Sequence, residues 1–397
     1  MEKASFFQVL AFLLTSLHLL ATCSLAMNIS TDQSSLLSLR AHITSDPNHI
    51  LSTNWSSSIS VCNWIGITCG SRHQRVIALT ISVSTNSVVK PPEFSHLRRL
   101  TDIDLSYNNF TGEIPIGIAT LQNLKRFALG YNNKLNGSNV LSIFNTSTLK
   151  ILDLREAGVT GDLPSDLCRC LRRLQTLTLG YNKLSGEIPR NISECSKLQV
   201  LMLFENNFVG TIPSELGTIP DKIGHVHNLK ELFIEENKLT GSIPLTLFNI
   251  SSLEVLYMND NMLEGLLPRQ IGNLTMLAWL TLYNNKLTGV IPDEVGNLQD
   301  LSAISLAFND FSGSIPIVIF NISSLVIIAL LGNHISGNLP STIGKPHFSL
   351  PNVEGIFLGG NNINGVIPSS ISNLTKLTAL ELYSNEFMVL FLNLLEI

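Results

Sequence analysis

A repeat of 24 residues runs through this chain of 397 residues from Val76 onward, and it constrains the fold more than any other feature. The unit reads L-x-x-L-x-L-x-x-N-x-L-x-G-x-I-P-x-x-I-x-x-L, as in Leu229 to Pro244 and Leu277 to Pro292. Its L-x-L segment places two leucines on one side of a short strand, and a single repeat is too small to bury them. Stacked repeats must share one core, so the sequence predicts an α/β solenoid whose strands form a parallel concave sheet.

The ninth column of the repeat holds Asn in eleven of thirteen repeats. It contains Ser84, Asn108, Asn132, Ala157, Asn182, Asn206, Asn237, Asn261, Asn285, Asn309, Asn333, Asn361 and Asn385. An Asn amide can satisfy backbone groups that a turn leaves unpaired, so we predict a ladder of amides from repeat to repeat. The Gly is expected to adopt a positive φ, and the Pro to end strand pairing.

The L-x-G-x-I-P signature resembles the plant-specific class of leucine-rich repeat. The preceding segment, with Leu36-Leu37, Asp46-Pro47, Asn54-Trp55 and Cys62-x-Trp64-x-Gly66-x-x-Cys69, resembles the N-terminal cap of that family. Together they are similar to the extracellular region of plant leucine-rich-repeat receptor kinases, in particular the subfamily that perceives microbial peptides. The resemblance implies a superhelix with a helical and disulfide-bonded cap at 27–75 and repeats over 76–386.

The first 26 residues have the features of a secretory signal, with Lys3, the apolar stretch Phe6 to Ala21 and small residues near Ala26. The alternative is a retained anchor, but a membrane span needs about 20 apolar residues and this stretch is shorter and interrupted by polar residues. The export signal and the repeat leucines account for a mean hydropathy of +0.28 without a membrane-spanning helix.

Two regions depart from the repeat. Between Asn206 and Asn237 the spacing is 31 residues, because Gly-Thr-Ile-Pro occurs at both 210–213 and 217–220. We interpret this duplication as a bulge on the convex side, with a functional loop as the alternative. At the other end, Phe387 to Ile397 is an apolar tail without Gly, Pro or a cysteine cap. It predicts a poor lid for the array and a product truncated before the transmembrane and kinase parts of the family.

The chain has six cysteines, and export places them in an oxidising compartment. Cys23 leaves with the signal, while Cys62 and Cys69 are close enough to close a small loop, so we predict a disulfide between them. Of the remaining three, Cys170 and Cys195 lie at nearly the same column of neighbouring repeats and are the favoured second pair over Cys168. Buried free thiols are an equally good alternative for these three.

No sequence feature points to catalysis, a cofactor or a nucleic acid. The net charge of −5 and pI near 6.0 lack the basic footprint of a polyanion-binding protein. Phosphate-loop, kinase, zinc-protease and zinc-cysteine motifs are missing from the sequence, so we expect no enzyme and no metal. The close pair His225 and His227 is interpreted as two exposed loop histidines.

Asn-x-Ser/Thr sequons are frequent, as expected for a secreted surface. Beyond Asn28 near the signal, they stand at Asn54, Asn109, Asn136, Asn145, Asn191, Asn249, Asn273, Asn321 and Asn373. Five of these, Asn145, Asn249, Asn273, Asn321 and Asn373, share one column four residues before a repeat begins, away from the strands. A ligand surface is therefore expected on the strand face.

The strand face carries aromatic and acidic residues in its outward columns. We predict ligand-binding roles for Phe204, Glu205, Phe233, Glu235, Glu236, Tyr257, Trp279 and Tyr283. Aromatic side chains about 5 Å apart from strand to strand would form an apolar stripe flanked by carboxylates, suited to an extended peptide with hydrophobic and basic groups. The alternative is that aromatic residues occupy these columns through β-propensity alone.

The leading functional interpretation is the ligand-binding ectodomain of a plant receptor-like kinase. It would recognise an extracellular peptide in defence or developmental signalling, act with a co-receptor leucine-rich-repeat kinase, and lie in the apoplast, secreted or at the plasma membrane. A secreted inhibitor of cell-wall-degrading enzymes is the rival, although that family has about ten repeats and cysteine caps at both ends. A non-functional fragment is the third interpretation.

Overall fold

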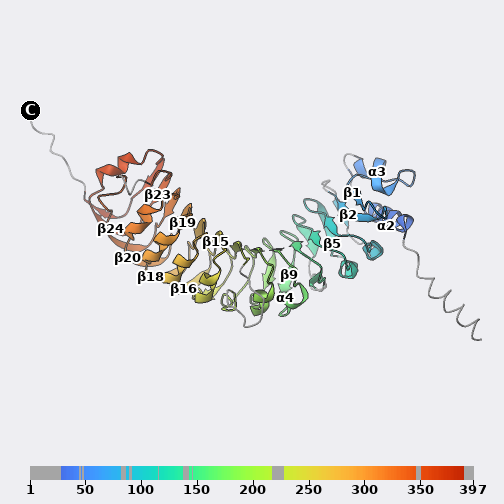
Figure 1. Cartoon of the computed structure of the whole chain (residues 1–397), viewed down its shortest axis with the longest axis horizontal. Coiled ribbons are helices and arrows are strands. Elements are labelled where there is room, and N and C mark those ends of the chain that lie inside the picture. The colour runs from blue at the N-terminus through green and yellow to red at the C-terminus, as the bar shows by residue number, and fades with distance from the viewer. Residues whose placement is uncertain are drawn as a thin grey trace, which may run out of the picture.

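A computed structural model describes residues 28–43, 46, 49–81, 86–88, 92–114, 116–136, 143–144, 146–216, 228–345 and 350–388. The repeats follow one another along an open arc from the blue N-terminal cap to the red C-terminal repeats (Figure 1). Strands β15, β19 and β23 of the longest sheet lie on the inner side of this arc. The predicted solenoid is confirmed.

Among the described residues, the concave sheet has fourteen strands, of which the first, β1, pairs antiparallel with β2. The other thirteen are parallel and contribute one strand per repeat, which matches the thirteen repeats counted in the sequence. Their bounds are β1 Ile67–Cys69, β2 Val76–Thr80, β4 Asp102–Asp104, β6 Arg126–Ala128, β8 Ile151–Asp153, β10 Thr176–Thr178, β12 Val200–Met202, β13 Glu231–Phe233, β15 Val255–Tyr257, β17 Trp279–Thr281, β19 Ala303–Ser305, β21 Ile327–Ala329, β23 Gly355–Phe357 and β25 Ala379–Glu381.

Further strands follow the Asn turn and pair in a second layer. A seven-stranded sheet contains β14 Thr240–Gly241, β16 Met262–Leu266, β18 Lys286–Val290, β20 Asp310–Ser314, β22 His334–Asn338, β24 Asn362–Gly365 and β26 Glu386–Phe387. Smaller sheets join β3 Asn86–Val88, β5 Asn109–Glu113 and β7 Lys134–Asn136, and pair β9 Thr160–Asp162 with β11 Lys183–Ser185. As predicted, the signature glycines have positive φ, for example +80° at Gly289.

Short helices close the repeats behind these sheets. Seven of them begin directly after a signature Pro, because Pro has no N–H to donate and its fixed φ suits the residue that precedes a helix. The 3₁₀ helices are η1 Val61–Asn63, η2 Pro92–His96, η3 Ile116–Thr120, η5 Arg190–Glu194, η6 Leu245–Asn249, η7 Arg269–Asn273, η8 Asp293–Asn297, η9 Ile317–Asn321 and η10 Ser369–Asn373. Three α-helices are described, α2 Ile29–Ala41, α3 Ile50–Asn54 and α4 Leu167–Cys170.

The predicted Asn ladder links each repeat to the one before it. Nδ2 of Asn285 donates to the carbonyl of Leu282 in its own repeat and to that of Met258 in the previous repeat, both at 3.0 Å. Oδ1 of Asn285 accepts from the backbone N–H of Leu263 at 3.0 Å. The Asn285 side chain thus bonds three buried backbone groups, and each of the two carbonyls is shared with the ladder Asn of a neighbouring repeat, Met258 with Asn261 and Leu282 with Asn309.

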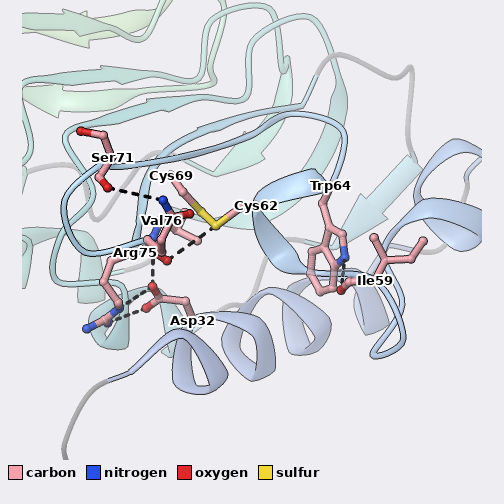
Figure 2. Close-up of a disulfide and its surroundings, with 9 residues drawn as sticks. Asp32, Ile59, Cys62, Trp64, Cys69, Ser71, Arg75 and Val76 are labelled. Atoms are coloured by element: carbon pink, nitrogen blue, oxygen red, sulfur yellow. Dashed lines mark hydrogen bonds and ion pairs between the residues drawn. A yellow bond between two sulfur atoms is a disulfide. The ribbon is translucent and has the colours of Figure 1, made fainter.

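A disulfide closes a loop within the N-terminal cap, and a buried ion pair lies where the cap meets the array (Figure 2). Cys62 and Cys69 are bonded as predicted. Asp32, in the first turn of α2, accepts hydrogen bonds from the Arg75 guanidinium and from the backbone N–H of Val76. The cap therefore covers the first hydrophobic edge of the solenoid, where the rings of Trp55 and Trp64 stack 5.3 Å apart.

The favoured second disulfide was wrong in one partner. Cys195 is bonded to Cys168, with the two Cα atoms 4.9 Å apart, and Cys170 is a free thiol. Cys168 and Cys170 are two positions apart in α4, so their side chains point in nearly opposite directions around the helix. Cys168 faces the core and Cys195, whereas Cys170 is half-buried at the surface. Comparing the columns of neighbouring repeats gives no information on how residues are rotated around a helix, so it could not choose Cys168 over Cys170.

Some predicted features lie outside the described residues. These are the export signal, Asn145, the second copy of Gly-Thr-Ile-Pro, His225, His227 and residues 389–397. The concave sheet nevertheless continues across the duplication, because Val200 of β12 pairs directly with Glu231 of β13. Within the described part of the chain, no helix is both long enough and apolar enough to cross a membrane.

Candidate ligand-binding face

Four aromatic side chains form a continuous row across neighbouring strands of the concave sheet. The ring of Phe204 lies 5.0 Å from Tyr181 and 6.5 Å from Phe233, and Phe233 lies 5.1 Å from Tyr257, measured between centroids. All three contacts are edge-to-face, an arrangement that aromatic quadrupoles favour. Tyr181 was not among the predicted site residues. Its signal was available, since a Tyr also precedes the column Asn in two earlier repeats, at Tyr107 and Tyr131.

Trp279 and Tyr283 lie on the next repeat but occupy different columns. Trp279 opens β17 and pairs in register with Val255, while Tyr283 lies beyond the end of the same strand. The side chain of Trp279 is 42% exposed, so a large aromatic surface is in contact with water. The structure therefore brings Phe204, Phe233 and Tyr257 into one row, and it places Trp279 and Tyr283 beside that row. We call these five residues with Tyr181 the aromatic stripe.

Two of the predicted acidic residues share the column that directly precedes the ladder Asn. Glu205 has a φ of 47° and Glu236 a φ of 52°, both in the left-handed region. Asp260 has the same conformation in the next repeat. The turn imposes this angle throughout the array, and Gly332 and Gly360 in the same column are the sequence signal for it. The turn conformation therefore fixes the direction in which these three side chains leave the backbone.

Glu235 is the most perturbed carboxyl of the face. Burial raises its pKa to about 7, and the neighbouring carboxylates Glu236, Glu205 and Asp260 add to the effect. Its Oε2 is buried and makes no hydrogen bond among the described residues. Among the ion pairs of the described residues, none involves these four carboxyl groups. The centre of the face therefore carries negative potential that the protein leaves uncompensated.

Two tyrosines connect the aromatic stripe to these carboxylates. A hydrogen bond to Glu205 raises the pKa of the Tyr181 phenol. Burial, with a hydrogen bond to Asp260, raises the pKa of Tyr283 to about 12. Both phenols remain neutral donors at physiological pH, and the acidic groups are interleaved with the rings.

The repeats nearer the N-terminus have a different chemistry on the same face. Tyr107 and Tyr131 stack with 4.4 Å between ring centroids, and the Arg155 guanidinium lies 5.3 Å above the Tyr131 ring. Arg155 and Asp153 form an ion pair of 2.9 Å. Charges in this region are paired within the protein, in contrast to the acidic centre.

The predicted glycosylation sites lie away from the aromatic stripe. Asn249, Asn273, Asn321 and Asn373 are each the last residue of a 3₁₀ helix, and all four are exposed. Asn136 is also exposed, whereas Asn54, Asn109 and Asn191 are half-buried. The side-chain amide atoms of Asn191 are buried without a hydrogen-bond partner. A glycan on the 3₁₀-helix column would leave the strand face open.

The part of the chain that the structure describes contains no cluster of three or more His, Cys, Asp or Glu side chains arranged to hold a metal ion. The acidic groups of the concave face lie next to one another on three consecutive repeats, with Glu205 on the first, Glu235 and Glu236 on the second and Asp260 on the third. Their arrangement suits recognition of an extended, cationic surface.

Comparison with sequence families identifies both parts of the chain. Residues 29–70 match the leucine rich repeat N-terminal domain. Six further segments match the leucine rich repeat, at 99–121, 173–195, 228–250, 252–274, 276–298 and 352–374.

Curated relatives include plant receptor kinases. The LRR receptor-like serine/threonine-protein kinase EFR of Arabidopsis thaliana is 32% identical over 95 residues, which are 24% of this chain and 9% of the relative. The serine/threonine-protein kinase BRI1-like 2 of the same plant is 34% identical over 171 residues, 43% of this chain and 12% of the relative. The similarity therefore spans a small part of these relatives.

Solved structures with the same fold include the ectodomains of plant receptor kinases. That of GASSHO1/SCHENGEN3 from Arabidopsis thaliana, in complex with CASPARIAN STRIP INTEGRITY FACTOR 2, has a TM-score of 0.80 and 28% identity over 90% of this chain and 44% of its own. The PEPR1-AtPEP1 structure has a TM-score of 0.73 and 30% identity over 90% of this chain and 52% of its own. The chain spans about half the length of these neighbours. Its N-terminal domain and repeat array are similar in sequence and in fold to the ectodomains of plant leucine-rich-repeat receptor kinases.

Proposed function

We propose that this chain is a ligand-binding ectodomain that recognises an extracellular peptide on its concave face. The observation that carries the proposal is the aromatic stripe, interleaved with carboxylates that have no cation partner in the described residues. Exposed rings supply apolar anchors, and the uncompensated carboxylates favour a ligand that brings positive charge. The ligand would therefore be an extended peptide with apolar side chains and Lys, Arg or a free amine.

Solved relatives support this choice of ligand class. The neighbour structures named above are complexes with CASPARIAN STRIP INTEGRITY FACTOR 2 and AtPEP1. Another neighbour, at 26% identity and a TM-score of 0.57, is the receptor kinase HAESA with the peptide hormone IDA and the co-receptor SERK1. By analogy, we propose a location outside the cell and signalling through a partner kinase.

The experiment uses the secreted, glycosylated chain and peptides that differ only in charge. The peptides are about 12 residues long, which is enough to span several repeats. All have the same apolar residues, and their remaining positions carry Lys in one series, Gln in a second and Glu in a third. Calorimetry should detect binding of the Lys series and much weaker binding of the Glu series. Phe233→Ala combined with Trp279→Ala should reduce the affinity of the Lys series at least about tenfold, since two aromatic anchors are lost.

The matched control removes two aromatic side chains from the same sheet outside the aromatic stripe. Tyr107→Ala combined with Tyr131→Ala should leave the affinity within about twofold, because these rings stack only with each other and Arg155. Equal binding of the Lys and Glu series, or unchanged affinity in the Phe233 and Trp279 double variant, would contradict the proposal.

A further inference from the structure

An apolar patch lies on the second sheet, apart from the concave face. Leu266 ends β16 and Val290 ends β18, and their side chains are 62% and 59% exposed. Leu245 and Ile317, in the repeats on either side, are 57% and 49% exposed. Large apolar side chains gathered on one surface mark an interaction site more often than isolated ones do.

Leu245, Leu266 and Val290 line a groove of about 870 Å³ that spans the repeats from Ser242 to Pro316. Leu266 leans over Gly289 of the next repeat, since a Cβ built there would lie 2.4 Å from its Cδ2. Val290 leans in the same way over Gly313, at 2.9 Å. The two side chains therefore form one continuous ridge beside the groove.

The residues of the patch are arranged symmetrically about a line between the repeats of β16 and β18. The column after the signature Gly holds Ser242, Leu266, Val290 and Ser314, in the order polar, apolar, apolar, polar. The column after the signature Pro holds Leu245, Arg269, Asp293 and Ile317, in the order apolar, basic, acidic, apolar. When the order of the four repeats is reversed, the first column places polar residues on polar and apolar on apolar. In the second column, Leu245 and Ile317 exchange places, and Arg269 exchanges with Asp293, which has the opposite charge.

We propose that this patch is a homotypic interface that takes a second copy of the same chain. The two-fold axis would lie in the interface, parallel to the strands and between the repeats of β16 and β18. Each residue then faces the residue of the second copy that is in the same column and equally far from the axis on its other side. Leu266 then faces Val290, and Leu245 faces Ile317. Arg269 faces Asp293 of the other copy, and this charge pair occurs twice because the interface is isologous.

Charges near the patch agree with this geometry. Arg269 has an exposed side chain and only a long contact within its own chain, 3.9 Å to Glu294. The column after the ladder Asn adds Lys238 at one end of the four repeats and Asp310 at the other, both exposed. The same two-fold axis makes Lys238 face Asp310 of the second copy. Opposite charges therefore meet at two independent columns, as electrostatic complementarity between partners requires.

The interface is small. Four repeats about 4.8 Å apart, each with roughly 15 Å of outward chain, offer roughly 300 Å² per copy, well below the 800 Å² of a standard stable interface. Association is therefore weak in solution and would matter where chains are concentrated. It uses neither the aromatic stripe nor its ligand.

Charge reversal tests the proposal through sedimentation equilibrium of the full glycosylated chain, over roughly 5 to 500 µM to suit a weak interface. The wild-type chain should shift toward twice its mass as the concentration rises. Arg269→Asp and Asp293→Arg, each studied alone, should remain monomeric, since like charges then face each other twice. An equimolar mixture of the two variants should associate again, because both charge pairs of the mixed dimer are attractive.

Arg190→Asp is the matched control. Arg190 also follows a signature Pro and makes a long ion pair, 3.6 Å to Glu215, but it lies outside the four repeats. This variant should self-associate like the wild type, while Leu266→Gln should not. A wild-type chain that stays monomeric, an Arg269→Asp chain that associates normally, or a mixture that remains monomeric would overturn the proposal. Binding of the Lys peptide series should be unchanged in Arg269→Asp, which separates this test from that of the ligand face.

Discussion

The guanidinium of Arg75 makes two hydrogen bonds of 2.6 Å to the carboxylate of Asp32, and both residues are buried. The pair connects α2 of the cap to the first strand of the repeats, and Asp32 also accepts from the Val76 N–H. An ion pair of this kind is costly to break on one side, because the remaining charge stays buried without a partner.

Asp32→Ala should therefore destabilise the cap by about 3 to 5 kcal/mol. Urea unfolding followed by tryptophan fluorescence measures this, with Trp279→Phe as the background so that only Trp55 and Trp64 of the cap report. Asp310→Ala is the control, since its contact with His334 is exposed, and it should change stability by less than about 0.5 kcal/mol. Equal stability of the two variants would contradict the role of the pair.

The Asn ladder predicts a large effect for a side chain with no charge. Asn285→Ala should reduce the free energy of unfolding by about 1 to 3 kcal/mol, because the buried Leu263 N–H loses its acceptor. The carbonyls of Met258 and Leu282 each lose one of two bonds and keep those from Asn261 and Asn309. Hydrogen exchange at the Leu263 amide should accelerate as well. Gln270→Ala, exposed on the neighbouring 3₁₀ helix, should alter neither quantity. Unchanged exchange at Leu263 would disprove the ladder.

The second disulfide can be checked by chemistry. Cys170 should be the single thiol among the described residues that reacts with a thiol reagent in the folded chain, and peptide mapping should recover Cys168 bonded to Cys195. Cys170→Ser should leave stability unchanged. Cys195→Ser should cost about 3 kcal/mol, the usual effect of opening a loop of this size. Recovery of a peptide that joins Cys170 to Cys195 would contradict the structure.

Glu235 predicts a specific pH dependence of stability. Its folded pKa of about 7 exceeds the ordinary value of 4.5, so folding favours the neutral form. This contribution is fully present below pH 4.5 and is lost as the pH rises through about 7. Because the side chain is partly exposed, the loss should be about 1 to 2 kcal/mol. Thermal unfolding at pH 5 and pH 8 should show a smaller difference for Glu235→Gln than for the wild type. An identical difference would reject this assignment.

The sequence alone determined the solenoid, the number of repeats, the Asn ladder and the first disulfide. The first three follow from a period, because each repeat can bury its leucines only against a copy of itself. The disulfide follows from the short spacing of Cys62 and Cys69. It also indicated the strand face on which Phe204, Phe233 and Tyr257 meet.

Only the tertiary structure decided which side chains touch. The rotation of α4 selected Cys168 over Cys170, and neighbouring strands brought Tyr181 against Phe204. The burial that raises the pKa of Glu235 depends on side chains of several repeats together. Likewise, Arg269 and Asp293 form part of one surface only because the structure places their consecutive repeats side by side. A repeat period fixes the column of a residue, but contacts between columns depend on how the stacked repeats pack in three dimensions.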